Sequence, residues 1–227
     1  MKIENCLETE LDLEQFINPS YFKSNSIEAI KKNFIEQSSI ELKDFLKEDI
    51  YSQLLQEFKE QTNPSTTNCN YIGPANRRHY QLLTPPKDST LHTLQTLFQS
   101  KKFSNFLYSL TNVSTNSCYG EIRNFNHGSY TLVHDHALEP HGIDVTFFCL
   151  DEKETEWDEN WGGQLVYMDR DDELLTVFPS KNSLLCVFRD PGVMRFVKYI
   201  NHYSTQIRPE FSFVYLEDSE EENKNEE

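Results

Sequence analysis

Three consecutive residues, His134-Asp135-His136, have the types and spacing from which a metal site could be built. Side chains two apart in an extended strand project from the same face, so His134 and His136 would point one way and Asp135 the other. Imidazole nitrogens are common ligands of iron, copper and zinc. With His202, which follows a later strand, the pair would complete a three-histidine site, and the chain would then be a cupin-like metal enzyme.

A non-haem iron oxygenase follows a different pattern. It needs two histidines and one carboxylate on one face of the metal, and a 2-oxoglutarate enzyme adds an arginine or lysine that pairs with the co-substrate. The position two residues after His134 is an imidazole, His136, and Asp135 should face away. The two histidines could also be structural side chains, hydrogen-bonded in the mouth of a barrel, and their spacing favours that simpler interpretation without excluding a metal site.

These residues lie in a strand-rich half of the chain. From Cys118 onward the apolar residues recur at a period of about 2 instead of about 3.6, which is typical of strands. Turn signals rich in glycine, proline and asparagine separate the segments. We predict eight strands, at Tyr119–Phe125, Ser129–Asp135, Ile143–Leu150, Gly163–Met168, Leu174–Phe178, Ser183–Phe188, Arg195–Ile200 and Phe211–Leu216.

The part before Cys118 is predicted to be mainly helical. Ser26 is a candidate N-cap for a helix over residues 27–35, and three-and-four spacing of apolar residues predicts helices over residues 50–58, 91–98 and 103–110. Strands are expected near residues 40–45 and within 71–83, on either side of a loop at 63–70. Helices that precede many short strands indicate a barrel with a helical support.

The predicted fold is therefore mainly β with flanking helices (α+β). It is a double-stranded β-helix, also called a jelly roll or cupin-like barrel, buttressed by N-terminal helices. We expect one non-catalytic domain over residues 1–216, with a mostly helical frame at 1–117 and barrel strands at 118–216. The run from Glu217 to Glu227 holds seven acids and one lysine and is predicted to be a disordered tail.

The formal net charge of -16 and the pI of about 4.8 argue against a nucleic-acid or anionic-membrane binder, because those partners are polyanions. A basic or protein partner fits better. Candidate surfaces are the acidic stretch Asp151–Asp158 and the Asp169–Glu173 turn, with Trp157 and Trp161 as either core residues or interface anchors. The basic-aromatic cluster at residues 77–80 is interpreted as a solvated edge in preference to a binding patch.

The five cysteines show no CxxC spacing and are odd in number, so neither a disulfide framework nor a cysteine-zinc site is indicated. Cys149 and Cys186 lie in apolar runs and are expected to be small core residues. No apolar signal region begins the chain, and no run approaches the length of a membrane span. A soluble protein of the cytosol or nucleus is expected.

Several separated motifs resemble one family in the right order. They are Phe16-Ile-Asn-Pro19, Gly73-Pro-Ala-Asn-Arg77, Gly120–Phe125, Gly128–His136, Gly162-Gly163, Asp172–Val177, Pro179 with Asn182-Ser-Leu, Phe196–His202 and Phe211-Ser-Phe213. They resemble the degradation C-terminal domain of the two-domain prolyl dioxygenases (prolyl 3,4-dihydroxylases) that depend on 2-oxoglutarate and iron and hydroxylate a ribosomal-protein proline. The resemblance covers nearly the whole chain.

The resemblance implies that this chain is a duplicated barrel without an active site. In that family the first domain carries the iron centre, with Fe(II), 2-oxoglutarate and ascorbate, and the second has lost it. Matching the last strands to an active domain puts Lys198 or Phe196 in place of the distal histidine. Glu210, or else Arg208, then stands in place of the base that binds 2-oxoglutarate. We therefore expect no catalytic, cofactor-binding or metal-binding residue here, while His134, His136 and His202 are the ligands if the chain is an active oxygenase.

The resemblance further implies a function in protein recognition. In fungal members this domain promotes degradation of a sterol-responsive transcription factor and is held off by an inhibitory nuclear regulator, with the oxygen-sensing catalytic domain setting the balance. The expected partners are thus its own catalytic domain, the degraded transcription factor and that regulator, in the nucleus and cytoplasm, with no direct contact to nucleic acid or membrane. The chain would be a fragment of a two-domain protein. A plain structural domain that packs only on its catalytic partner is a third alternative.

Overall fold

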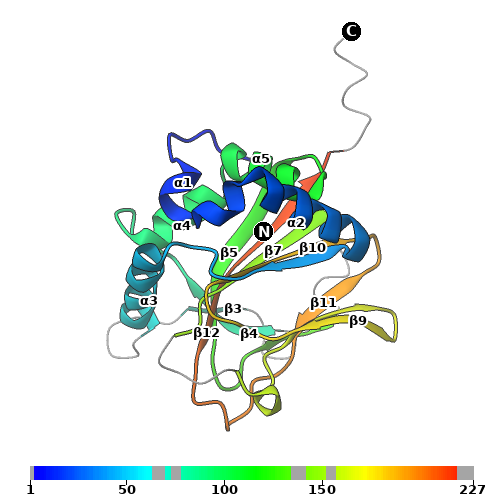
Figure 1. Ribbon diagram of the computed structural model, residues 1–227. Coiled ribbons are helices and arrows are strands. Elements are labelled where there is room, and N and C mark those ends of the chain that lie inside the picture. The colour runs from blue at the N-terminus through cyan, green and yellow to red at the C-terminus, as the bar shows by residue number, and fades with distance from the viewer. Residues whose placement is uncertain (1–2, 63–69, 73–77, 134–141, 152–156, 219–227) are drawn as a thin grey trace.

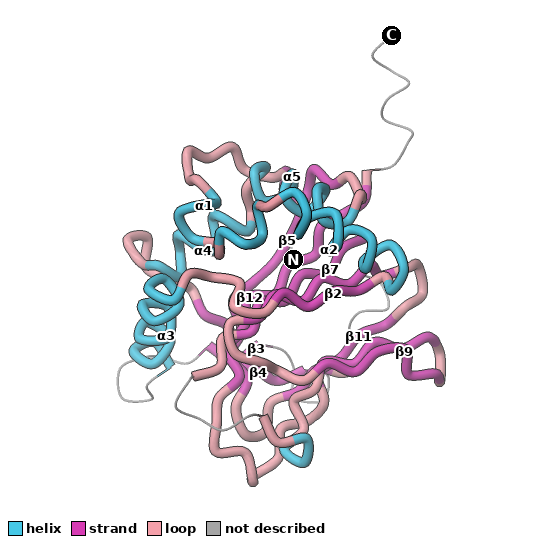
Figure 2. Tube along the Cα trace, in the orientation of Figure 1, coloured by secondary structure: helices cyan, strands magenta, loops and turns pink. Residues whose placement is uncertain are grey.

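A helical layer covers one face of a large sheet, and a small sheet lies on the other face (Figures 1 and 2). The computed structural model describes residues 3–62, 70–72, 78–133, 142–151 and 157–218. The two sheets form the jelly-roll barrel that the sequence predicts, and the antiparallel pairing of every named strand agrees with that fold.

The large sheet has the strand order β2-β10-β7-β12-β5-β4-β3. Its four central barrel strands are β10 (Ser183–Arg189), β7 (Gly142–Phe148), β12 (Arg208–Glu217) and β5 (Thr115–Phe125). The outer strands are β2 (Ser39–Leu42), β4 (Arg78–Leu83) and β3 (Asn70–Ile72), while β1 (Glu4–Asn5) pairs with β5 and β6 (Tyr130–Thr131) with β4.

The small sheet has the order β11-β8-β9, formed by Met194–Val197, Leu165–Asp169 and Asp172–Val177. All eight predicted strands are therefore present, although their ends differ. β5 begins four residues before the predicted start at Tyr119, and β6 spans only two residues. The end of the predicted segment Ser129–Asp135 lies outside the described residues.

Successive side chains of β12 point alternately to the two faces of the large sheet, and a separate hydrophobic cluster lies on each face. Phe211, Phe213 and Tyr215 belong to the larger cluster, which also contains the buried residues of the helices. The residues between them face the barrel interior, because Glu210 pairs in register with Arg123 on β5 and with Phe148 on β7, and paired residues share a face. Phe148 belongs to a second cluster that draws on both sheets. Arg208, Glu210 and Ser212 consequently point into the barrel.

The helices pack their apolar stripes on the outer face of the large sheet. They are α1 (Leu13–Phe16), the 3₁₀ turn Pro19–Phe22, α2 (Ser24–Gln37), α3 (Glu48–Thr62), α4 (Thr90–Phe98) and α5 (Lys101–Thr111). Ser26 is not the cap of its helix, because α2 begins two residues earlier after Lys23. Ser89 and Ser100 cap α4 and α5 through their side chains, as serines do at this position.

The strands expected within the mostly helical first part of the chain are present as β2, β3 and β4, which extend the large sheet. The predicted boundary of the tail needs a correction. The predicted tail starts too early: Glu217 ends β12, and Asp218 accepts a hydrogen bond from the Ser114 hydroxyl at 2.6 Å. The rest of the acidic run lies outside the described residues. In the described part of the chain, no helix is both long and apolar enough to cross a bilayer.

Candidate functional site

The inner face of the barrel carries charged side chains where a jelly roll usually places its ligand or its apolar core. They come from five different strands and are all buried, with exposed fractions of 4% or less: Arg123 on β5, Asp144 on β7, Arg189 on β10, Arg195 on β11, and Arg208 and Glu210 on β12. A buried ion is costly unless it is paired, so the pairing of these groups decides what the barrel can bind.

Glu210 is held between two arginines. Arg123 donates to its Oε1 through both Nε, at 2.8 Å, and Nη2, and the Nη2 of Arg208 lies 2.7 Å from its Oε2. Both guanidinium groups also lie over aromatic rings. The guanidinium carbon Cζ of Arg208 is 4.8 Å from the ring centre of Phe125 and 5.3 Å from that of Phe148, and the Cζ of Arg123 is 5.3 Å from the ring centre of Phe125. The faces of these rings further stabilise the positive charges.

The pKa values of the two arginines in this triad shift in opposite directions. Burial lowers the pKa of Arg208 to about 10, since removal from water disfavours the charged form and the nearby Arg123 adds repulsion, against the attraction of Glu210. Burial also lowers the pKa of Arg123, but the attraction of Glu210 outweighs this effect, so the pKa of Arg123 is raised. Both therefore remain charged at neutral pH, and together they hold the Glu210 carboxylate as their counter-ion.

A second cluster is centred on Asp144. Its Oδ2 accepts from the Nε of Arg189 at 3.0 Å and lies 3.1 Å from the Nη1 of Arg195. Arg189 sits at the end of β10, next to β7, whereas Arg195 reaches across from β11 of the small sheet. Asp144 thus ties the two sheets together at this end of the barrel.

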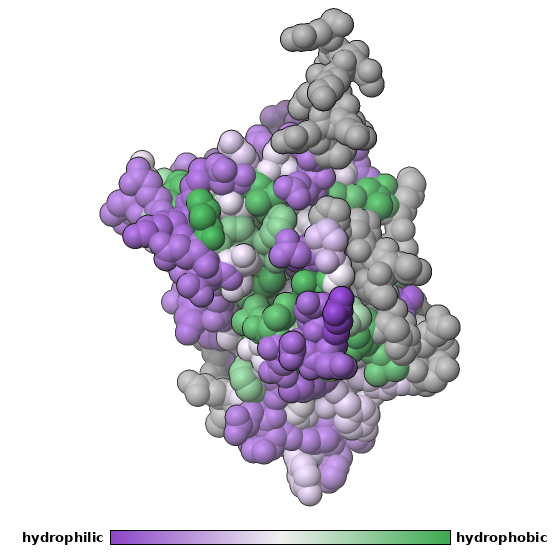
Figure 3. Space-filling model, turned by 90° about the vertical axis from the view of Figure 1, so that its right-hand side faces the viewer, coloured by the Kyte–Doolittle hydropathy of each residue, from purple (hydrophilic) through white to green (hydrophobic). Residues whose placement is uncertain are grey.

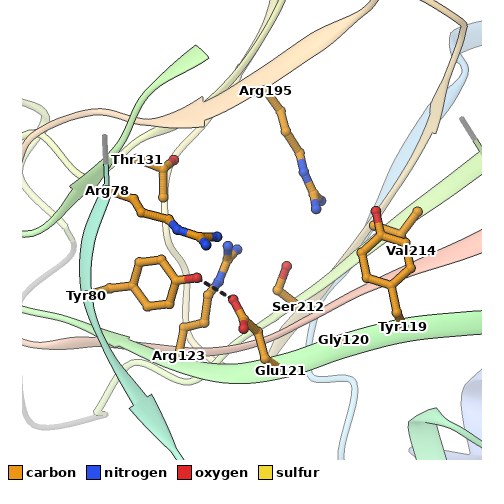
Figure 4. Close-up of a pocket in the computed structure, with 10 residues that line it drawn as sticks. All are labelled: Arg78, Tyr80, Tyr119, Gly120, Glu121, Arg123, Thr131, Arg195, Ser212 and Val214. Carbon is orange, nitrogen blue, oxygen red and sulfur yellow. Dashed lines mark hydrogen bonds between the residues drawn. The ribbon is translucent and has the colours of Figure 1, made fainter. Parts of the chain in front are cut away.

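Between the two clusters lies a small cavity (Figure 4). Arg78, Arg123 and Arg195 point toward it from three strands, and the Tyr80 hydroxyl donates to Glu121 Oε1 at 2.6 Å on one side. The cavity has a volume of about 10 Å³. That is room for roughly one water molecule and no more. A dicarboxylate such as 2-oxoglutarate could enter only if several of these side chains moved.

The predicted register of the distal-ligand strand is wrong. Lys198 and Phe196 do not face the barrel interior: Lys198 is partly exposed and lies 3.8 Å from Glu173, and Phe196 alternates with the buried residues of β11. The inward positions are Arg195 and Val197. A guanidinium is a permanent cation without a lone pair for a metal, so the residue that faces inward at the start of β11 cannot be an iron ligand.

The residues considered for a metal site are not brought together by the described structure. His134 and His136 lie outside the described residues. His202 is in an exposed turn after β11, where its ring contacts those of His127 and Tyr203. Within the described ranges, no group of three histidine, cysteine, aspartate or glutamate side chains could hold a metal ion.

The prediction for the co-substrate base named both Glu210 and Arg208, and both residues face the barrel interior. They form an ion pair with each other, so the positive charge of Arg208 is matched by a carboxylate from within the chain. A co-substrate carboxylate that approached either arginine would therefore meet the negative charge of Glu210 beside it.

The aromatic residues of the predicted surfaces belong to the core. Trp157 is buried, its indole donates to the Gly162 carbonyl at 2.7 Å, and its ring meets that of Trp161 edge-on. Residues 152–156 of the acidic stretch lie outside the described residues. Tyr80, predicted at a solvated edge, is 1% exposed and packs in the barrel core against Phe125. The Asp169–Glu173 turn is confirmed, between β8 and β9.

Cys149 and Cys186 are buried free thiols in the core, as expected, and burial raises the pKa of each. Cys6 and Cys118 are free as well. Cys118, Cys149 and Cys186 are all buried with raised pKa values, so none of these three thiols is a reactive group on the surface, whereas Cys6 is partly exposed and its pKa is lowered, chiefly by a hydrogen bond with Cys118.

A larger hollow lies outside the barrel mouth. It is a groove of about 1020 Å³ between β2, at the edge of the large sheet, and β9, at the edge of the small sheet. Most of its floor and walls are apolar, formed by Ile40, Leu150, Trp157, Leu175, Val177, Phe178, Pro179 and Leu185.

Among the inward arginines, Arg208 was named from the sequence and Arg123 was missed, although Arg123 left a signal there. On β5 the residues Tyr119, Glu121, Arg123 and Phe125 alternate with neighbours of the other face, and charged residues at this period are usually read as the solvent side. In a closed barrel both faces are buried once helices cover the outside. The sequence thus shows which residues of β5 share a face, but it does not show which of the two faces lines the barrel interior.

Comparison with known proteins gives a consistent result. Residues 8–223 match the family model described as "Oxoglutarate and iron-dependent oxygenase degradation C-term". The prolyl 3-hydroxylase OGFOD1 of Xenopus laevis is 31% identical over 252 residues, which cover 90% of this chain and 48% of that protein. The chain thus spans about half the length of the curated relative.

Solved structures share the fold at low identity. A prolyl-4-hydroxylase from Pseudomonas putida has a TM-score of 0.61 and 13% identity, covering 85% of this chain and 100% of its own. A prolyl hydroxylase from Trichoplax adhaerens, solved in complex with a peptide of a hypoxia-inducible factor, has a TM-score of 0.58 and 13% identity over 90% of this chain and 98% of its own. These similarities establish the oxygenase-type jelly roll.

Proposed function

The chain belongs to the oxoglutarate- and iron-dependent oxygenase degradation C-terminal family, and from this premise we propose that it is a non-catalytic, protein-binding domain of a prolyl dioxygenase. The observation that carries the proposal is the filling of the barrel. Arg195 takes the inward position at the start of β11, and Glu210 takes the carboxylate position beside Arg208 and Arg123.

Each of these side chains replaces one requirement of the oxygenase reaction. Iron bound in such a barrel would activate oxygen and hold 2-oxoglutarate, with a histidine from this strand as one ligand. Arg195 supplies a positive charge of its own instead, neutralised by Asp144. Glu210 neutralises the arginines that a co-substrate carboxylate would need. The described residues therefore do not fit the iron and 2-oxoglutarate pair.

A barrel stabilised by its own ion pairs still offers outer surfaces for other proteins. By the family resemblance we extend the proposal to three partners: the catalytic domain of the same protein, a sterol-responsive transcription factor that is degraded, and an inhibitory nuclear regulator. Their encounter would take place in the nucleus and cytoplasm, with oxygen sensed by the catalytic domain. The strongly acidic chain would favour basic surfaces on these partners and a salt-sensitive association.

A turnover assay tests the non-catalytic part. The chain is incubated with Fe(II), 2-oxoglutarate, ascorbate and oxygen, and succinate is measured with and without prolyl peptides. The prolyl-4-hydroxylase of Pseudomonas putida serves as the active control. We expect no succinate above the protein-free blank. Succinate that forms with the wild-type chain and disappears in the double variant His134→Ala/His136→Ala would contradict the proposal and favour an active metal-dependent oxygenase that uses His134, His136 and His202.

A further inference from the structure

The groove between β2 and β9 has the features of a site for an extended peptide. Strand β9 pairs with β8 on one side, and none of the described residues forms a strand on its other side. β2 is likewise the last strand of its sheet. Free strand edges are templates for pairing with another chain, and proteins usually protect them.

The edge strand β9 begins with two acids and pairs with β8 through a bulge, but its second half has only uncharged side chains and lacks such protection. Leu174 is 57% exposed, and Phe178, which follows β9 directly, is 40% exposed. Leu175 and Val177 alternate with them and line the groove. An added strand would therefore find apolar side chains beside a row of backbone donors and acceptors, which is how peptides bind by strand addition. Figure 3 views the molecule from the side of the β8–β9 hairpin and shows apolar surface next to hydrophilic surface on this face.

The charges around the groove select the kind of peptide. Glu41, Asp151 and Glu159 line it, and β9 begins with Asp172 and Glu173, against two lining lysines, Lys43 and Lys181. Two further lysines pair with these acids from outside the groove, Lys59 with Asp151 and Lys198 with Glu173, but both are substantially exposed, and solvent screens such pairs. The chain as a whole carries a formal charge of -16. With these five acids against two lining and two outer lysines, the rim has a small acidic excess, which, together with the net charge of the chain, is complementary to a basic, partly apolar partner.

The groove volume of about 1020 Å³ stands at the upper end of the range of about 300–1,000 Å³ for small-molecule sites. Its shape follows two strand edges and is not enclosed. These dimensions favour a chain segment over a compact metabolite.

From these observations we infer that the β2–β9 groove binds an extended basic segment of a partner protein, which adds as a strand to the free edge of β9. The inference rests on the proposed function, since it names the surface and the partner chemistry of the binding domain.

The probe for the test is a fluorescent synthetic peptide that alternates valine and lysine. Its binding to the wild-type chain is measured by anisotropy at low and physiological salt. A peptide with proline in place of each valine has the same charge but cannot pair as a strand, and one with glutamate in place of each lysine reverses the charge. We expect saturable binding of the valine-lysine peptide only, and slower hydrogen exchange of the Leu174–Val177 amides in the complex.

Variants locate the site. Phe178→Lys places a positive charge beside the groove, which repels the lysines of the peptide, and should weaken peptide binding by about tenfold. The control Tyr108→Lys changes an aromatic residue of similar exposure, 49%, on α5, and should leave binding within about twofold. Thr176→Lys, at a position of β9 that lines the groove, is the second groove variant, for use if the first alters the melting curve.

Equal binding of the proline peptide, or unchanged exchange of the β9 amides on saturation, would overturn the inference. So would equal weakening in Tyr108→Lys, because that result would point to attraction by net charge alone. These outcomes are independent of the succinate assay. If the groove does not bind the peptide, the non-catalytic proposal still stands, and succinate production would refute that proposal whether or not the peptide binds.

Discussion

Removal of the Glu210 carboxylate should strongly destabilise the barrel. In Glu210→Ala, Arg123 and Arg208 would both stay buried, at 4% and 0% exposure, without the carboxylate that neutralises them. Breaking a buried pair by deleting one partner costs about 3–5 kcal/mol. A chain of this size loses about 2–4 °C in melting temperature per kcal/mol, so we expect a decrease of roughly 6–20 °C.

The same variant tests whether Glu210 occupies a ligand position. The substitution removes a group the size of acetate, so added acetate should bind between the two arginines and restore stability. At a concentration of 100 times its dissociation constant, a ligand of the folded state contributes about 2.7 kcal/mol. Melting is followed by circular dichroism with acetate and, at equal ionic strength, with chloride.

Two controls sharpen the result. Glu121→Ala removes a partly buried carboxylate that accepts one hydrogen bond from Tyr80, and should cost only about 1 kcal/mol with no acetate effect. The double variant Glu210→Ala/Arg208→Met leaves one uncompensated guanidinium instead of two, and should be more stable than Glu210→Ala alone. If Glu210→Ala costs less than Glu121→Ala, or if acetate and chloride act alike, Glu210 is not the counter-ion of this site.

Three further predictions concern packing and titration. Gly162→Ala should destabilise the fold by about 2 kcal/mol or more, because the φ of Gly162 is 79° and a Cβ there would lie 1.9 Å from the backbone oxygen of Tyr199. Gly128→Ala should cost only about 1 kcal/mol, because Gly128 has a similar φ of 88° but open space around it. Urea unfolding of both variants measures the difference. Asn182→Ala should lower the free energy of unfolding by about 2–4 kcal/mol, because the Asn182 side chain accepts a hydrogen bond from the backbone N–H of buried Leu46 and donates one to its carbonyl, both at 2.9 Å. A loss below about 1 kcal/mol in the same assay would refute this role. Burial raises the pKa of Tyr51 and Tyr215 above the ordinary value of about 10, so the stability they contribute is complete below that pH and is lost above it; tyrosinate absorbance should appear together with unfolding, and smooth ionisation of a folded chain would contradict the assignment.

The fold could be predicted because its signals are local. The change of apolar period at Cys118 and the glycine and asparagine turns located all eight barrel strands, and the stripes of α3, α4 and α5 located the helices. Strand ends were less certain because pairing partners decide them. β5 starts early, at Thr115, since β12 continues to Glu217 and pairs with it.

The filling of the barrel could be predicted only in part. The resemblance led to Glu210 and Arg208, yet it placed Lys198 or Phe196 at the distal position, because the length of the turn between β11 and β12 cannot be read from one sequence. Arg195 faces inward through its pairing with Tyr167 on β8, a long-range contact that sets the register. Arg123 was missed for a similar reason, because only the packing of helices on the outside identifies its face as the interior.

The measurement that most directly tests a barrel filled by its own ion pairs is anaerobic titration calorimetry of the metal-stripped chain, first with Mn(II) in place of Fe(II) and then with 2-oxoglutarate. The account predicts no saturable heat from either, in the wild type and in His134→Ala alike. Saturable metal binding that strengthens the binding of 2-oxoglutarate, and that is lost in His134→Ala, would contradict it.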